Sequence, residues 1–173
     1  TGDAIHVDDS QVTLGTGEFT IEYWMYPYEV HSNYVMFDCR HGTNNWPSNN
    51  DGFGHIFNNT GFYGVDGYSS GGVQMVGHSE FKNCKIKRQH WYHIAHTRDS
   101  NNTQRFFING KCVQSHKGNT VFDYDQTRMC WGNSASFGEG FKGWMQDIRV
   151  YKGSGSCKYT QDLVPATPAP TAM

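Results

Sequence analysis

The segment from Trp91 to Ser115 contains the strongest local fold signal in this sequence. Three short runs rich in aromatic and β-branched residues follow one another, separated first by Asp99–Asn102 and then by Asn109-Gly110. An Asn-Gly pair favours the two positive-φ positions of a type I′ turn, which joins two antiparallel strands directly. We therefore predict a three-stranded antiparallel meander, with strands at 91–97, 104–108 and 111–115.

Composition extends this prediction to the whole chain. Leucine occurs only as Leu14 and Leu163, whereas the 173 residues include 20 Gly, 10 Tyr and 11 Phe. Aromatic side chains fit a pleated sheet, and Gly supplies tight turns. Further strands are predicted at 19–26, 34–39, 53–57, 62–65, 73–76, 129–131 and 143–151. Short strands without helical segments indicate two packed antiparallel sheets, although a seven-stranded immunoglobulin-like sandwich fits the same signals.

The terminal segments and the net charge of the chain limit the classes of protein to which it can belong. Residues 164–173 are rich in proline, alanine and threonine, a composition typical of an extended linker. No run approaches the ~20 apolar residues of a membrane span, and residues 1–20 lack the pattern of a signal peptide. We expect one domain over residues 1–163, a linker or tail over 164–173, and a longer parent protein without membrane insertion. The formal net charge of −2 and the lack of a long basic run argue against nucleic-acid binding.

Three motifs, in order along the chain, carry a family resemblance. They are GTGEFTIEYW from Gly15, WYHIA with the following TRD and FINGK from Trp91, and GWMQDIRVY from Gly143. Together they resemble the laminin-G-like domains of the concanavalin A-like lectin and glucanase type. This resemblance implies an all-β, two-sheet antiparallel jelly-roll sandwich. The tail from Lys152 to Pro165 is similar to the version of this domain in phage and virus structural proteins.

The resemblance also implies a function, because such domains often bind glycans or proteins. We expect a non-catalytic recognition or adhesion domain, displayed outside a cell or on a virion, whose partner is a cell-surface glycan or a neighbouring protein subunit. The rival hypothesis is a purely structural decoration or fibre module of a viral particle. Fold alone does not decide between them.

A glycan hydrolase is the least favoured hypothesis. Hydrolysis of a glycosidic bond needs two carboxylates that face each other across the substrate. In its predicted strand Glu22 has only Thr20 and Trp24 at two-residue spacing, and Asp147 is likewise isolated. We expect Met145, Asp147 and Arg149 to share one face of the closing strand. The missing pair of acids predicts that the chain is not an enzyme.

Two segments are candidate ligand sites. The first is the polar loop 44–51, in which an aromatic ring stands among amide and carboxylate groups of the kind that bind sugars: Trp46, Asn49, Asn50 and Asp51. Its alternative is that the Trp46 ring packs over the core. The second segment offers Tyr63, Asp66 and Tyr68, with a Gly-rich hairpin carrying exposed tyrosines as the alternative. A weaker candidate is the loop 136–141, which contains two phenylalanines.

No cofactor is required by this interpretation, and calcium is the one ion that the resemblance implies for some relatives. Asp51 and Asp66 offer oxygen ligands for it, but Gln146 stands where relatives commonly carry an acidic residue, which weakens the expectation.

The histidines and cysteines carry no recognisable metal or redox motif. His93 must point away from the face shared by His90 and His96, so these three side chains cannot converge on a metal. The five cysteines contain no CxxC pair, and both disulfides and buried thiols stay open.

Overall fold

The computed structural model describes residues 4–8, 14–31, 34–39, 52–57, 63–68, 74–76, 85–118, 128–133 and 139–161, with the backbone alone at 63–68 and 74–76 and at Asp8, Gly52, Arg128 and Glu139. These residues form twelve strands and no helix. They divide into two compact units. The first consists of Thr1–Thr16, Val30–Ile86 and Phe122–Lys142, and the second of Gly17–Glu29, Lys87–Val121 and Gly143–Met173.

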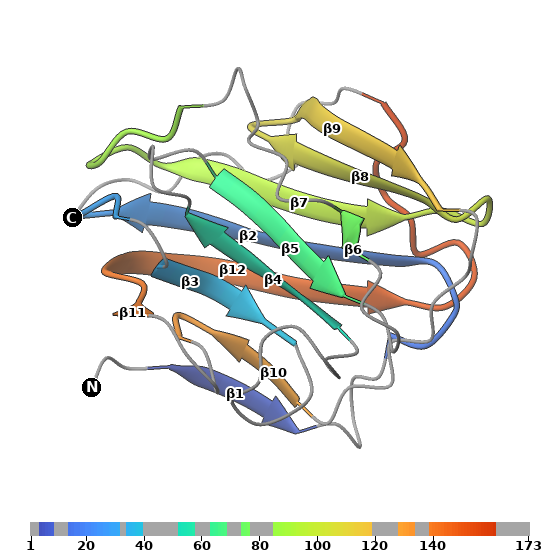
Figure 1. Ribbon diagram of the computed structural model, residues 1–173, viewed down its shortest axis with the longest axis horizontal. Coiled ribbons are helices and arrows are strands. Elements are labelled where there is room, and N and C mark those ends of the chain that lie inside the picture. The colour runs from blue at the N-terminus through green and yellow to red at the C-terminus, as the bar shows by residue number, and fades with distance from the viewer. Residues whose placement is uncertain are drawn as a thin grey trace. The chain divides into compact units, whose positions relative to one another are not determined.

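The first unit contains a seven-stranded sheet (Figure 1). Its strands are β1 (Ile5–Asp8), β3 (Tyr34–Asp38), β4 (Gly52–Phe57), β5 (Tyr63–Tyr68), β6 (Gln74–Val76), β10 (Arg128–Trp131) and β11 (Glu139–Gly140). They follow the order β1-β10-β3-β4-β5-β6, while β11 pairs with β3 in parallel. β1 and β11 were not predicted: β11 has only two residues, and β1 has four, with one short alternation of Ile5 and Val7 against His6 and Asp8. Every other pairing in this sheet is antiparallel.

Aromatic side chains form the core of the first unit. All five residues of β3 are buried. The ring of Phe37 lies 4.9 Å from Trp131, 5.0 Å from His55 and 5.6 Å from Phe53, measured between ring centroids. A central strand buried on both faces explains why this segment reads as a continuous apolar run.

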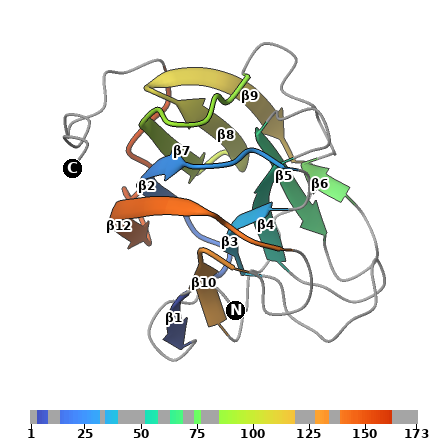
Figure 2. The ribbon, with the colours of Figure 1, turned by 90° about the vertical axis from the view of Figure 1, so that its left-hand side faces the viewer.

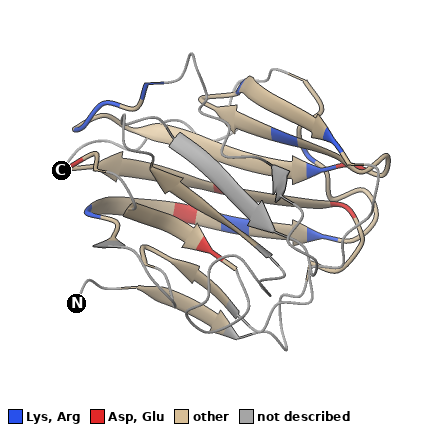
Figure 3. Ribbon diagram, in the orientation of Figure 1, with Lys and Arg blue, Asp and Glu red and all other residues tan. Residues whose placement is uncertain are grey.

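The second unit contains a five-stranded antiparallel sheet in the order β12-β2-β7-β8-β9, which Figure 2 shows from a second direction. Its strands are β2 (Phe19–Pro27), β7 (Tyr92–Arg98), β8 (Thr103–Ile108), β9 (Lys111–Lys117) and β12 (Gly143–Lys152). The first and last strands of this unit, β2 and β12, are thus neighbours in the sheet. The described strands carry few charged side chains (Figure 3).

The predicted meander is confirmed in detail. Strands β7, β8 and β9 pair in sequence, and the turn between β8 and β9 has φ of 52° at Asn109 and 80° at Gly110. The Asp99 carboxylate closes the preceding turn by accepting hydrogen bonds from the backbone N–H of Asn101 and Thr103, at 3.0 and 2.9 Å. Local sequence chemistry thus determines both hairpins.

One face of the three central strands of this sheet, β2, β7 and β8, is almost completely shielded from solvent. It is made by side chains with 0–7% exposure: Phe19, Ile21, Tyr23 and Met25 of β2, Ile94 and His96 of β7, and Phe106 and Ile108 of β8. Burial of this many large side chains supplies the main stabilisation of the unit, at roughly 1.5–3 kcal/mol each. The other face of the sheet carries the polar and aromatic groups considered next.

Candidate functional site

Alternation along β2 places Thr20, Glu22, Trp24 and Tyr26 on the face opposite to the shielded one. We call it the Glu22 face. In the register of the sheet, Glu22 lies beside Ala95 of β7 and Arg149 of β12 in directly paired positions. Cross-strand pairs of this kind bring side chains within contact distance.

Glu22 is held by four side chains. The Tyr159 hydroxyl donates a hydrogen bond to its Oε2 atom, and Nε2 of His93 lies 3.3 Å from the same oxygen. On Oε1, Nη1 of Arg149 lies at 3.6 Å and the Tyr151 hydroxyl at 3.4 Å. Glu22 itself is only 5% exposed. Nδ1 of His93 has no hydrogen-bond partner among the described residues, which favours the tautomer that carries its proton on Nε2, towards Glu22.

These partners fix the protonation of the cluster. Burial alone raises the pKa of Glu22, but the hydrogen bonds from His93 and Tyr159 and the charge of Arg149 outweigh it, so the pKa lies below its usual value. The pKa of Tyr159 is raised, by burial and by its hydrogen bond to Glu22. Glu22 is therefore ionised at neutral pH while Tyr159 keeps its proton. A carboxylate with a lowered pKa is a poor general acid.

The segment that follows β12 crosses part of the Glu22 face. Thr20 donates from Oγ1 to the carbonyl of Ser156 at 2.9 Å, and Thr97 donates from Oγ1 to the carbonyl of Tyr159 at 3.2 Å. The Tyr159 side chain is buried in a small cluster with Ala95 and Phe107. This segment therefore closes the Glu22 carboxylate off from solvent.

Four aromatic rings gather at the other end of the same face. We call Tyr26, Tyr28, Trp91 and Trp144 the aromatic platform. The rings of Tyr26 and Trp144 are 5.2 Å apart and those of Trp91 and Trp144 are 6.4 Å apart, and both pairs are inclined by only 27°. Tyr28 meets Trp144 edge-on at 5.3 Å. Tyr26, Trp91 and Trp144 are partly exposed, and Tyr28 is 42% exposed.

A bulge in β12 determines which of its side chains join the Glu22 face. The register with β2 shifts between Gln146 and Arg149, where Asp147 has a φ of 51°. The bulge puts Trp144, Gln146 and Arg149 on the Glu22 face. The prediction that Met145, Asp147 and Arg149 share one face was wrong, because Met145 pairs with Met25 on the shielded face. A single inserted residue reverses the alternation beyond it.

Comparison with known protein families matches residues 1–156 to a laminin-G model described as the concanavalin A-like lectin/glucanases superfamily. The chain belongs to this superfamily. The predicted fold class, an all-β jelly-roll sandwich with two sheets, is thereby confirmed, and the one departure from antiparallel pairing is β11. The immunoglobulin-like alternative is set aside. A comparison with curated protein sequences finds no match.

Solved structures similar to this concanavalin A-like domain include neurotoxin binding domains and an arabinanase domain in complex with a saccharide. The botulinum neurotoxin serotype D binding domain superposes with a TM-score of 0.63 at 13% identity, covering 94% of this chain and 38% of that one. A serotype D ligand-binding domain in complex with N-acetylneuraminic acid gives 0.60 at 12% identity, covering 94% and 38%. Domain 4 of AbnA, an extracellular arabinanase from Geobacillus stearothermophilus in complex with arabinotriose, gives 0.58 at 17% identity, covering 88% and 77%. The chain thus spans less than two fifths of the neurotoxin chains, and these likenesses show the fold alone.

The sequence-predicted ligand residues fall largely outside the described side chains. Trp46, Asn49, Asn50 and Asp51 lie outside the described residues. Tyr63, Asp66 and Tyr68 lie in β5, where Asp66 pairs with Gly54 of β4, and only their backbone is described. These assignments stay predictions. In the third candidate loop, Phe141 is 8% exposed and its ring lies 6.4 Å from that of Phe57, so Phe141 is a core residue.

The aromatic platform of this concanavalin A-like domain was not predicted from the sequence. Its rings belong to three separate motifs, and they meet only because β2 lies between β7 and β12. The alternating pattern of residues 19–26 did place Trp24 and Tyr26 on one face. The strand order that adds Trp91 and Trp144 to that face has no local signal.

The described histidines and cysteines form neither a metal site nor a redox motif. His93 lies on the Glu22 face and His96 on the shielded face, as alternation predicts. No group of three His, Cys, Asp or Glu side chains gathers as a metal site in the described part of the chain. The described cysteines Cys39, Cys112, Cys130 and Cys157 form no disulfide with one another. The described ranges also contain no helix of the length and hydropathy that crossing a membrane requires.

Proposed function

We infer that this chain is a non-catalytic recognition domain that binds a saccharide. One observation carries the inference: the carboxylate at the centre of its polar cluster is engaged by its own neighbours. The superfamily includes both lectins and glucanases, and the state of Glu22 favours the lectin side of that division. A carboxylate that is ionised, 5% exposed and held by Tyr159 and His93 offers no free oxygen to a glycosidic bond.

No second carboxylate flanks Glu22 among the residues that the structure describes. Two hydrolytic carboxylates must stand ~5–9.5 Å apart. The described positions that flank Glu22 on its face are Thr20, Trp24, Ala95 and Arg149, none of them acidic. Glu18, four residues back, lies ~13 Å away along an extended chain. It already accepts hydrogen bonds from the backbone N–H of Ser100 and Gly155.

The similar solved structures support a saccharide as the ligand class. AbnA domain 4 holds arabinotriose, and a neurotoxin binding domain holds N-acetylneuraminic acid, on folds that superpose on this chain. We extend the inference to display outside a cell or on a virion, where a glycan or a neighbouring subunit is within reach. The competing function is a decoration or fibre module that contacts only its own assembly.

Calcium is not needed for this function. Three of the described carboxylates, Glu18, Glu22 and Asp99, already have protein partners, and Gln146 has a neutral amide. The proposed calcium ligands Asp51 and Asp66 come from the sequence alone. We expect the same saccharide affinity in excess calcium and in EDTA, and a loss of binding in EDTA would contradict this.

Glycan-array binding followed by isothermal titration calorimetry tests the function. We expect the purified chain to bind at least one oligosaccharide, with no release of reducing sugar after prolonged incubation. Absence of binding across the array would favour the structural-module alternative. Turnover that is abolished by Glu22→Gln would instead establish a hydrolase.

A further inference from the structure

The aromatic platform consists of large aromatic side chains of the kind usually buried in a core, yet all four are at least partly exposed to solvent. Trp144, Trp91 and Tyr26 come from three adjacent strands or their ends, and each keeps part of its ring surface exposed. Among the described residues the only large hydrophobic side chains classed as exposed are Ile5 and Tyr28. Tyr28 belongs to the platform. A contiguous exposed apolar patch rimmed by polar residues commonly marks a binding site for a ligand or a partner.

Trp144 lies at the centre of the platform. Its ring is inclined by 27° to both Tyr26 and Trp91, while Tyr26 and Trp91 are inclined by 53° to each other and Tyr28 meets Trp144 at 72°. The four rings therefore form a continuous but uneven aromatic surface. A sugar ring presents an apolar C–H face with hydroxyl groups around its edge, so a partly exposed aromatic ring with hydrogen-bonding groups at its border is complementary to it.

Polar side chains border the platform on two sides. Along β12, Gln146 is exposed on the same face as Trp144, and the Arg149 side chain beyond it is 40% exposed. On the other side, the backbone N–H of Gln89 donates to the carbonyl of Pro27 at 2.7 Å, which fixes the turn before Trp91 against the end of β2.

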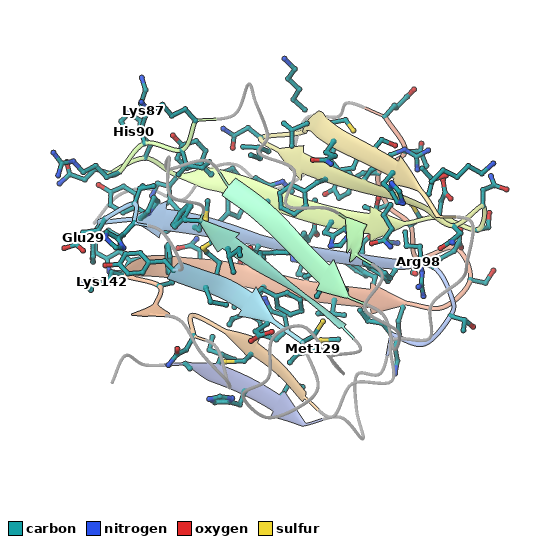
Figure 4. All side chains as sticks on the ribbon, in the orientation of Figure 1. Glu29, Lys87, His90, Arg98, Met129 and Lys142 are labelled. Atoms are coloured by element: carbon teal, nitrogen blue, oxygen red, sulfur yellow. The ribbon has the colours of Figure 1, made fainter. Side chains whose placement is uncertain are left out.

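The same turn supplies exposed polar groups. Figure 4 shows Lys87 and His90 on this segment, and both are exposed. His90 donates from Nδ1 to the carbonyl of Arg88 at 2.9 Å, because a carbonyl can only accept. When neutral, its ring then presents Nε2 as an acceptor. The amide of Gln146 and the ammonium and imidazole groups of this turn are therefore available to sugar hydroxyls.

We propose that the aromatic platform is the saccharide-binding site of this domain, with a sugar ring stacked on Trp144 and Tyr26 and its hydroxyls bound by Gln146 and the turn at residues 87–90. The proposal rests on the proposed function. Protein interfaces are enriched in Phe, Met and Arg as well as in Tyr and Trp. The platform contains no Phe or Met and is bordered by Gln146 and an exposed polar turn, which favours a sugar over a protein partner.

Titration of the whole chain with sialyllactose, arabinotriose and maltotetraose, followed by intrinsic tryptophan fluorescence and calorimetry, tests the site. Trp144→Ala and Tyr28→Ala are expected to weaken binding of whichever sugar the parent chain binds, by about tenfold or more for Trp144→Ala. Tyr151→Ala is the matched control, since Tyr151 is a half-buried aromatic residue on the same face and the same strand. Thermal unfolding monitored by circular dichroism confirms that each variant is folded.

The possible outcomes test the proposed site and the proposed function separately. Weakened binding in Trp144→Ala and Tyr28→Ala, with unchanged binding in Tyr151→Ala, supports the aromatic platform as the binding site. If the parent chain binds a sugar and both platform variants bind equally well, the proposed site is wrong while the function stands. Loss in Trp46→Ala alone would then assign binding to the loop 44–51. If the parent binds none of the sugars, the proposed function fails first. Should Trp144→Ala not fold, Tyr28→Ala decides, because its side chain is 42% exposed.

Discussion

At the scale of single residues, the position of Glu22 depends on a residue 137 positions away in the chain. A buried carboxylate is stable only when its oxygens are paired. We expect Tyr159→Phe, which removes one donor from Oε2, to lower the free energy of unfolding by about 1.5–3 kcal/mol in urea titrations. Tyr151→Phe is the control and should cost less than half as much, because its hydroxyl is 3.4 Å from Oε1. Equal losses in the two variants would mean that the hydroxyls of Tyr159 and Tyr151 stabilise the Glu22 carboxylate equally.

His96 gives the protein a predictable sensitivity to acid. Complete burial lowers its pKa from 6.5 to about 3, although its Nε2 donates to Oε1 of Gln104 at 2.9 Å. Below pH 6.5 the unfolded chain therefore takes up a proton that the folded chain refuses until about pH 3, and stability falls as the pH drops through this window. The expected slope approaches ~1.4 kcal/mol per pH unit.

Urea titrations between pH 7 and 5 measure this effect in the range above ordinary carboxylate titration. His96→Gln keeps a hydrogen-bonding side chain and should flatten the slope. His116→Gln replaces an exposed histidine and should leave the slope unchanged. An unaltered slope in His96→Gln would show that the acid sensitivity arises elsewhere.

At the scale of elements, the turn between β8 and β9 was predictable because its chemistry is local. Gly110 has a φ of 80°, where a Cβ atom is strained. Gly110→Ala should therefore lower the free energy of unfolding by about 1 kcal/mol or more. At Gly17 an added Cβ would have its nearest contact at an ordinary 3.9 Å, so Gly17→Ala should change stability by less than ~0.5 kcal/mol. Chemical denaturation of both variants checks the pair, and similar effects would refute the backbone argument.

What the sequence could not predict at this scale is non-local. The apolar pattern of β2, buried on both faces, and the meander follow from the residues themselves. The bulge at Asp147 reverses a clear alternation, and nothing in the strand's own pattern marks it. β11 is a two-residue strand that exists through its pairing with β3.

The same distinction applies to the candidate site. The isolation of the Glu22 carboxylate within its strand could be predicted, because spacing within one strand is a local property of the sequence. Its partners Tyr159 and Arg149, and the rings brought together by the order β12-β2-β7, required the topology.

At the scale of the whole molecule, the position of the domain's end follows from how the segment after β12 is anchored. Thr20, Thr97 and Glu22 each bind it, and the Tyr159 ring is 7% exposed against Ala95 and Phe107. We expect a chain ending at Leu163 to melt at the same temperature as the full chain, because residues 164–173 are proposed to be a linker. A chain ending at Cys157 loses Tyr159, and the removal of a buried aromatic side chain costs about 3–5 kcal/mol.

Scanning calorimetry of the three chain lengths tests this boundary. For a protein of this size such a loss lowers the melting temperature by roughly 6–20 °C. If the chain ending at Leu163 melts well below the full chain, the linker assignment is wrong, and the last ten residues belong to the folded domain. If the chain ending at Cys157 melts like the full chain, the anchoring of Tyr159 does not stabilise the fold. Glu22 would then be stable without the hydrogen bond from Tyr159, and its carboxylate could no longer be regarded as unavailable for catalysis.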